Sequence, residues 1–321
     1  MFTKFAAICS NTFKEVVRQP IFGVLLAVGT MAMVLNPAIA AYTMEDDNKL
    51  LKDLGLSTLF VVGLFLAGFG ATGVVSQEIE NKTVLTVVSK PIGRWVFIAG
   101  KFVGIAAALV IACYLLSLVF FMTVRHTVMW AAWIDYDLPV IIFGSSALLL
   151  AVVVAAWGNY ARGWHFGAAA VFLCLPLMTA AGLLICLIDK EWQLQPITTD
   201  LDPQLFAATL LVFLAVLVLA AVAIAASTRL GQVMTLVVCS GAFVLGLISS
   251  YVFGRFSEES VLAGIAYRLT PELTFFWISD ALTQGNPVTL AHVGWVCLYG
   301  GVYIVAILAV AVALFQQREV G

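Results

Sequence analysis

Long apolar runs alternate with short polar segments along the whole chain. A helix needs about 20 residues, at a rise of 1.5 Å each, to cross the ~30 Å hydrocarbon core of a bilayer. The pattern therefore predicts an all-α polytopic membrane protein, with one transmembrane domain over 21–321 behind an interfacial helix at 1–20. Eight runs are long enough to span a membrane: 21–42, 56–77, 97–123, 139–158, 166–188, 205–227, 232–253 and 291–315.

Composition supports the membrane interpretation. Apolar residues make up 63% of the 321 residues and charged residues 11%, whereas soluble domains are roughly 45–50% apolar even with glycine included. One soluble core cannot hide so much apolar surface, so the solvent must be lipid. The net charge of −2 gives no information about nucleic acid because the charges are sorted by membrane side, and we expect no such partner.

Lysine and arginine set the expected orientation, because short cytoplasmic loops carry an excess of them. With the N-terminus inside, ten of the sixteen basic residues fall in inside segments, and fourteen of the eighteen acids fall outside. We therefore expect a multi-pass protein of the inner (cytoplasmic) membrane with both termini in the cytoplasm.

The first eighteen residues predict an amphipathic helix that Pro20 ends. Its apolar arc holds Phe2, Phe5, Ala6, Cys9, Phe13, Val16 and Val17, while Lys4, Asn11, Lys14 and Arg18 point the opposite way. Such a helix lies in the headgroup plane with its cations toward anionic lipid. Packing on a cytoplasmic partner is an alternative, and Ala38-Ile39-Ala40 leaves open a cleavable signal peptide.

A polar island at 78–101, EIENKTVLTVVSKPIGRWVFIAGK, interrupts the apolar pattern between the second and third runs. From Lys82 to Lys90 it can form a short amphipathic helix that Pro91 stops. Val84, Leu85, Val87 and Val88 fall on one side, opposite Lys82, Thr83, Thr86, Ser89 and Lys90. The helix could lie flat on the inner leaflet, or it could couple to a partner protein.

The sequence patterns that resemble catalytic or cofactor-binding motifs are incomplete or lie in the wrong context in this chain. Gly68, Gly70 and Gly73 match G-x-G-x-x-G but sit inside an apolar span, where small residues serve close helix packing. Gly93 to Lys101 lacks the glycine and the hydroxyl residue of a phosphate loop. The isolated cysteines and histidines suggest no metal site, and no span has a charge near its centre for ion coupling. We expect no catalytic residue, no enzyme activity and no cofactor in this chain.

The stretch LTPELTFFWISDALTQG, in the longest outside segment, mixes aromatic and acidic residues. Pro271 predicts the start of a helix, and Phe275, Phe276 and Trp277 form an aromatic cluster. Such clusters favour short re-entrant helices that dip into the outer interface. The segment 189–204 reads as an ordinary exposed loop.

Residues 76–104, SQEIENKTVLTVVSKPIGRWVFIAGKFVG, resemble the membrane subunit of ABC-2 type exporters. Their Glu-Ile-Glu, Lys-Thr, hydrophobic patch, Lys-Pro-hydrophobic-x-Arg and Gly-Lys elements follow that family's order. The N-terminal helix, ASTRLGQ at 226–232, the aromatic stretch and the final LFQQRE add to the resemblance.

The resemblance implies a permease that pairs with a separate ABC ATPase, which would hold ATP and Mg²⁺, in a complex with two copies of each chain, here most simply a homodimer. The N-terminal helix would be the interfacial elbow, carried by Phe2, Phe5, Phe13, Lys14 and Arg18, and Pro271 to Trp277 would be outer re-entrant helices. The family's first cytoplasmic loop contacts the ATPase, which points here to Glu78, Glu80, Lys82, Thr83, Val84, Leu85, Val87, Val88, Lys90, Pro91 and Arg94.

The family commonly has six spans, so 139–188 is an additional hairpin. A membrane scaffold or assembly factor without transport is the alternative function, and an ion-coupled transporter is a third. The uniformly apolar spans favour a lipidic or amphipathic cargo over a charged one.

Overall fold

The computed structural model describes residues 2–42, 47–76, 93–128, 136–197, 199–200, 202–255, 264–265, 267, 270–283 and 288–316. Within these ranges, eight helices are long and apolar enough to cross a membrane, which confirms the predicted all-α polytopic class. They are α2 Pro20–Ala40, α3 Asp47–Ala71, α6 Arg94–His126, α7 Leu138–Arg162, α8 Phe166–Leu187, α9 Pro203–Ser227, α10 Gln232–Ser249 and α13 Leu290–Gln316.

Shorter elements complete the described chain. The helix α1 spans Phe2–Arg18, as its amphipathic pattern predicts, and α2 begins after the extended residue Gln19. Two π-helical turns, η1 Thr72–Ser76 and η2 Ser250–Gly254, continue α3 and α10. The 3₁₀ helix η3 Leu273–Phe276 and the short helix α12 Ser279–Thr283 precede α13.

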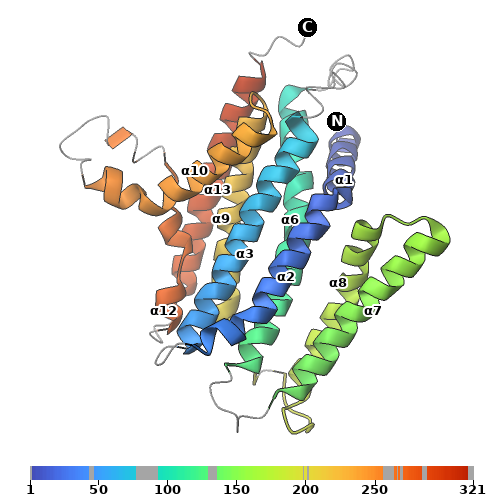
Figure 1. Ribbon diagram of the computed structural model, residues 1–321. Coiled ribbons are helices and arrows are strands. Elements are labelled where there is room, and N and C mark those ends of the chain that lie inside the picture. The colour runs from blue at the N-terminus through green and yellow to red at the C-terminus, as the bar shows by residue number, and fades with distance from the viewer. Residues whose placement is uncertain are drawn as a thin grey trace.

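The second span is longer than its apolar run. The helix α3 begins at Asp47, nine residues before the predicted start at 56. The leucines and lysines of 49–54 are good helix formers, whereas the charged residues among them keep this stretch out of the apolar run. The extra turns carry Lys52 and Asp53 at the end of the bundle opposite α1 (Figure 1).

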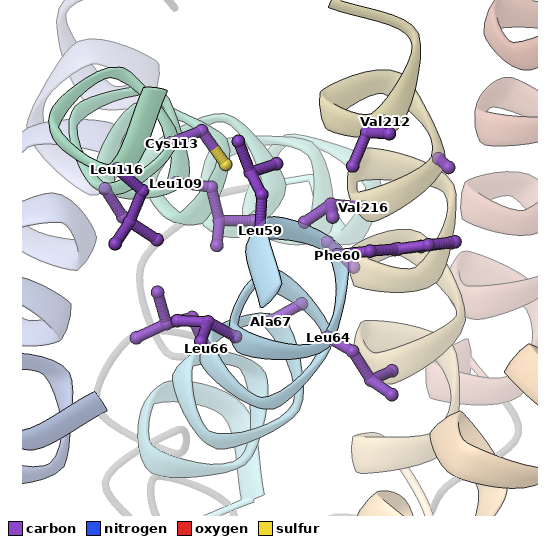
Figure 2. Close-up of a cluster of buried hydrophobic side chains, with 14 of the residues drawn as sticks. Leu59, Phe60, Leu64, Leu66, Ala67, Leu109, Cys113, Leu116, Val212 and Val216 are labelled. Atoms are coloured by element: carbon purple, nitrogen blue, oxygen red, sulfur yellow. The ribbon is translucent and has the colours of Figure 1, made fainter. Parts of the chain in front are cut away.

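The core centres on α3, which lies between α6 and α9 (Figure 2). Figure 2 shows Leu59, Phe60 and Ala67 of α3 among side chains of both neighbours. Gly63 allows α9 to approach closely, since a Cβ there would lie 2.6 Å from Val216 Cγ2. Lipid tails are as apolar as the side chains, so the hydrophobic effect does not drive membrane helices together. Close van der Waals packing, which small residues allow, holds them instead.

The helices α7 and α8 form a hairpin on the side of the bundle away from α10 and α13 (Figure 1). Its turn is closed by Gly163 in the left-handed conformation, with φ of 67°, a geometry that glycine adopts without a Cβ penalty. Gly23 of α2 packs against Gly167 of α8. The predicted additional hairpin is thus a packed part of the protein.

Candidate functional site

The predicted coupling residues from Glu78 to Pro91 lie outside the described residues. The structure describes both ends of that segment, Ser76 in η1 and Arg94 at the start of α6. What the loop is attached to can therefore be determined.

Two arginines hold the end of α13. A guanidinium nitrogen of Arg94 donates to the carbonyl oxygen of Gln316 at 2.8 Å, and one of Arg229 donates to the carbonyl oxygen of Leu314 at 2.8 Å. The last carbonyls of a helix have no partner within the helix and carry the negative end of its dipole, so cations stabilise them. Buried Phe97 and Phe315 stack beside this contact, with ring centroids 5.5 Å apart. The exit of the predicted coupling loop is thus joined to α13.

The entrance of the same loop leaves a π-helical turn. The hydroxyl of Thr72 donates to the carbonyl oxygens of Gly68 and Phe69. Gly73 lies against Gln19, and a Cβ there would be 2.1 Å from the Gln19 amide nitrogen. The glycines of the G-x-G-x-x-G sequence therefore pack helices together, and π-turns of this kind often mark functional positions.

The helix α1 packs against α6 at two glycines. A Cβ on Gly100 would lie 2.8 Å from Ile8, and one on Gly104 would lie 2.6 Å from Thr12 Cβ and 2.7 Å from the carbonyl oxygen of Cys9. The four-residue glycine spacing brings two helix backbones together. Thr12 is fully buried as a result.

A buried lysine adds an ionic contact to this packing. Lys101 is 2% exposed, and its ammonium lies 3.9 Å from a Glu15 carboxylate oxygen and 5.5 Å from the centroid of the Phe97 ring. A charge this buried must be compensated by a partner charge or ring. The ammonium therefore ties α1 to the start of α6.

The five predicted elbow residues divide into two groups. Phe5 and Phe13 are half-buried, Phe5 toward Gly100 and Phe13 edge-on to Phe172 of α8, with ring centroids 6.2 Å apart. Phe2, Lys14 and Arg18 are exposed. The predicted apolar arc therefore only partly matches the packed side, since Thr12 is buried while Phe2 and Ala6 are not. The reason is that the two glycines of α6 select which side of α1 is covered.

At the opposite end of the bundle, a cavity of about 820 Å³ lies between α6, α8 and α9. Its walls are mainly apolar, including Leu118, Phe121 and Phe213, with the hydroxyls of Tyr114 and Thr179 hydrogen-bonded at 2.9 Å. Its rim is charged on both signs and holds Arg125, Asp189, Lys190, Asp200 and Asp202. Such a cavity can accept an apolar chain below a zwitterionic or polar head.

Arg125 organises that rim, and sequence reasoning missed it. Its side chain pairs with Asp137 at 3.2 Å and Asp200 at 3.0 Å, and it also donates to the carbonyl oxygens of Ile185 and Ile188. It thereby joins the end of α6, the start of α7 and the end of α8.

The described residues of the segment 189–204 are mostly exposed, as predicted, but the segment is also tied to the bundle. Its Asp200 is held by Arg125, Ile188 and Leu194 form an isolated antiparallel bridge, and Asp202 caps α9 while pairing with Lys52 at 3.9 Å. The sequence did carry a signal. Arg125 comes directly after the apolar run 97–123, and the acids Asp137 and Asp200 come shortly before the runs at 139–158 and 205–227.

The aromatic segment before α13 contains short helices, but they start later than predicted. Pro271 lies outside the helix, and Glu272 is extended, so η3 begins at Leu273. The backbone N–H of Glu272 donates to the Tyr299 hydroxyl at 2.9 Å instead of entering a helical turn. Its carboxylate accepts a hydrogen bond from Tyr267, which raises the pKa of that phenol.

The predicted aromatic cluster packs into the bundle. Phe276 is buried, Phe275 lies edge-on to Tyr299, and the Trp277 ring stacks on Phe60 with centroids 6.4 Å apart. The hydroxyl of Ser279 donates to the Asp53 carboxylate. The segment therefore bridges α3 and α13 at the end away from α1.

Residues 6–158 match the family model described as ABC-2 family transporter protein. This region includes most of α1, the whole island 78–101 and most of α7, and the match confirms the resemblance carried by residues 76–104. Residues 6–158 therefore resemble an ABC-2 transporter domain, which supports a membrane permease of the ABC type. A search of curated proteins found no significant match to the chain.

Proposed function

We propose that this chain is the transmembrane subunit of an ATP-driven ABC-2 type exporter, with the ATPase on a separate chain. The match of residues 6–158 to the ABC-2 transporter family carries the proposal. Permeases of this class associate with an ABC ATPase, so ATP and Mg²⁺ belong on that partner. The chain itself then needs no catalytic residue.

The coupling route in this proposal runs from the loop 78–94 into the bundle. Motion of the ATPase pushes the aliphatic side of residues 82–90, and Arg94 passes the displacement to α13 through Gln316. The loop entrance at η1 contacts Gln19, so the junction of α1 and α2 moves with it. In this orientation the end of the bundle that holds α1 faces the cytoplasm, and two copies of the chain form a homodimer.

The proposed cargo is amphipathic. The cavity between α6, α8 and α9 offers apolar walls and a rim with both signs of charge, which fits an acyl chain under a zwitterionic head. Uniformly apolar spans without a central charge support the same class of cargo.

Copurification tests the proposal. A tagged chain should retain an ATPase subunit, and the substitutions Val84→Asp, Leu85→Asp, Val87→Asp and Val88→Asp together should abolish retention. The matched control, Thr83→Asp, Thr86→Asp and Ser89→Asp, charges the opposite side of the same segment and should preserve it. Retention of the ATPase by the four-residue variant would disprove the coupling assignment, and absence of any ATPase from the wild-type complex would favour the scaffold.

A further inference from the structure

A second cavity, of about 470 Å³, lies between the C-terminal half of α1 and the turn that joins α7 to α8. Lys14 and Arg18 line it from α1, and Trp164 and His165 line it from the turn. Val17 and Phe172 are among the side chains of its apolar floor. The additional hairpin and the N-terminal helix thus share one site.

The charged residues that line this cavity, Lys14 and Arg18, are both positive. Among the described residues that line it, none is acidic. Lys14 and Arg18 are four residues apart on a helix and therefore neighbours, an arrangement of like charges that is unfavourable without an anion between them. The amino end of α8 adds to the positive potential, because His165 provides no side-chain cap there.

A third cation is held beside the cavity by aromatic rings. The guanidinium carbon of Arg162 lies 5.5 Å from the centroid of Trp157 and 5.6 Å from that of Trp164. Trp164 is fixed in turn, since its ring covers Gly158 so closely that a Cβ there would be 2.1 Å away. Tryptophan and arginine in this arrangement are typical of the membrane–water interface.

The depth of the cavity along the membrane normal matches that of the lipid headgroups. It lies where α2 and α8 begin, at Pro20 and Phe166, so its floor faces hydrocarbon and its cations face the polar layer. Phe13 and Phe172 meet edge-on across it. Cationic side chains above an apolar floor fit a ligand with a phosphate and acyl chains.

We propose that this cavity binds an anionic phospholipid, with its phosphate between Lys14 and Arg18 and an acyl chain against Val17 and Phe172. The bound lipid joins α1 to the additional hairpin. The assignment uses the orientation in the proposed function, in which this end meets the anionic inner leaflet, but the binding itself requires no ATPase.

Binding of fluorescent phosphatidylglycerol to the purified full-length chain, in a neutral detergent, tests the site. Phosphatidylglycerol should bind more tightly than phosphatidylcholine with the same label. Each of Lys14→Gln and Arg18→Gln should weaken binding about five-fold, the usual effect of one interfacial cation. Arg255→Gln removes a charge elsewhere and should change nothing.

Two further experiments distinguish binding in the cavity from attraction to surface charge alone. Ala168→Phe keeps both cations but fills the cavity, so it should abolish binding, whereas each single loss of a cation only weakens it. Soluble glycerophosphate at the same concentration should not compete. Unchanged binding by Ala168→Phe, equal affinity for the two lipids, or full competition by glycerophosphate would each overturn the lipid site, while an ATPase that copurifies normally with these variants would leave the proposed function intact.

Discussion

Arg94 at the start of α6 donates a hydrogen bond to the carbonyl oxygen of Gln316 at the end of α13, across 222 residues of sequence. Arg229, in the turn between α9 and α10, makes the same kind of contact with Leu314. The exit of the loop predicted to meet the ATPase is therefore part of the support of the last helix. In the coupling route that we propose, Arg94 passes a displacement of that loop to α13 through this contact.

Removing these two contacts should loosen the end of α13. In the double variant Arg94→Gln/Arg229→Gln, the final carbonyls lose both cationic donors, each worth about 0.3–1 kcal/mol at such a position. Amide hydrogen exchange at residues 313–316 should accelerate by about two- to five-fold for each arginine. Arg255→Gln is the control, and equal exchange in all three proteins would show that the contacts do not hold the helix.

Replacing Gly104 with alanine should separate α1 from α6. A methyl group there meets the Cys9 carbonyl oxygen at 2.7 Å, a backbone atom that cannot rotate away, and overpacking of this kind costs about 1–3 kcal/mol. Gly241→Ala is the matched control, since its Cβ would meet no atom within 4 Å and alanine favours a helix by about 1 kcal/mol. Thermal unfolding should shift down for the first variant and not for the second.

The labelling rate of the Cys9 thiol should also reveal whether α1 has separated from α6. Burial raises the pKa of the Cys9 thiol, so less of the reactive thiolate is present at neutral pH. Detaching α1 removes that burial, lowers the pKa and should speed maleimide labelling in a chain whose other five cysteines are replaced by alanine. An unchanged labelling rate in Gly104→Ala would contradict the described packing.

Loss of Arg125 should be strongly destabilising. Asp137 is fully buried, and removing its partner leaves an uncompensated charge, which costs about 3–5 kcal/mol. Arg125→Gln should therefore lower the free energy of unfolding in detergent by an amount of that order. The second change Asp137→Asn should restore part of it, because the amide oxygen can still accept the hydrogen bond from the Val140 backbone N–H that caps α7. No rescue by Asp137→Asn would show that the pair is not coupled.

Filling the cavity between α6, α8 and α9 should weaken binding of an amphipathic cargo. Gly182 lines this cavity, and Gly182→Phe places a ring in the space of the acyl chain. A fluorescent lysophosphatidylcholine should bind the wild-type chain and lose at least about ten-fold in affinity in this variant, or about 1.4 kcal/mol. Gly301→Phe, at a position with no atom near its Cβ, should bind normally. Equal binding by both variants would remove the cavity as a cargo site.

The spans were predictable from sequence because hydropathy alone specifies a membrane helix. All eight predicted spans correspond to helices, and the N-terminal helix ends at Arg18, just before the Pro20 that was predicted to stop it. The additional hairpin followed from the same signal. Boundaries failed where polar turns continue a helix beyond the bilayer, as at Asp47.

The contacts between elements were not predictable, because they join residues with no shared pattern. Two partners of Arg125 are Asp137, which is 12 residues away along the sequence, and Ile188, which is 63 residues away. No sequence periodicity links these positions. The covered side of α1 depends on Gly100 and Gly104 of another helix. The spacing of apolar residues in α1 could therefore identify an amphipathic helix, but it could not show that Thr12 would be buried. The function of the segment 78–91 remains a prediction from its resemblance and pattern.

Photo-crosslinking at the island tests the central claim most directly. A photoreactive amino acid at Val87 should form an adduct with an ABC ATPase subunit in native membranes, while the same amino acid at Lys190, at the opposite end of the bundle, should not. Formation of the ATPase adduct from Lys190 and not from Val87 would contradict both the orientation and the coupling role.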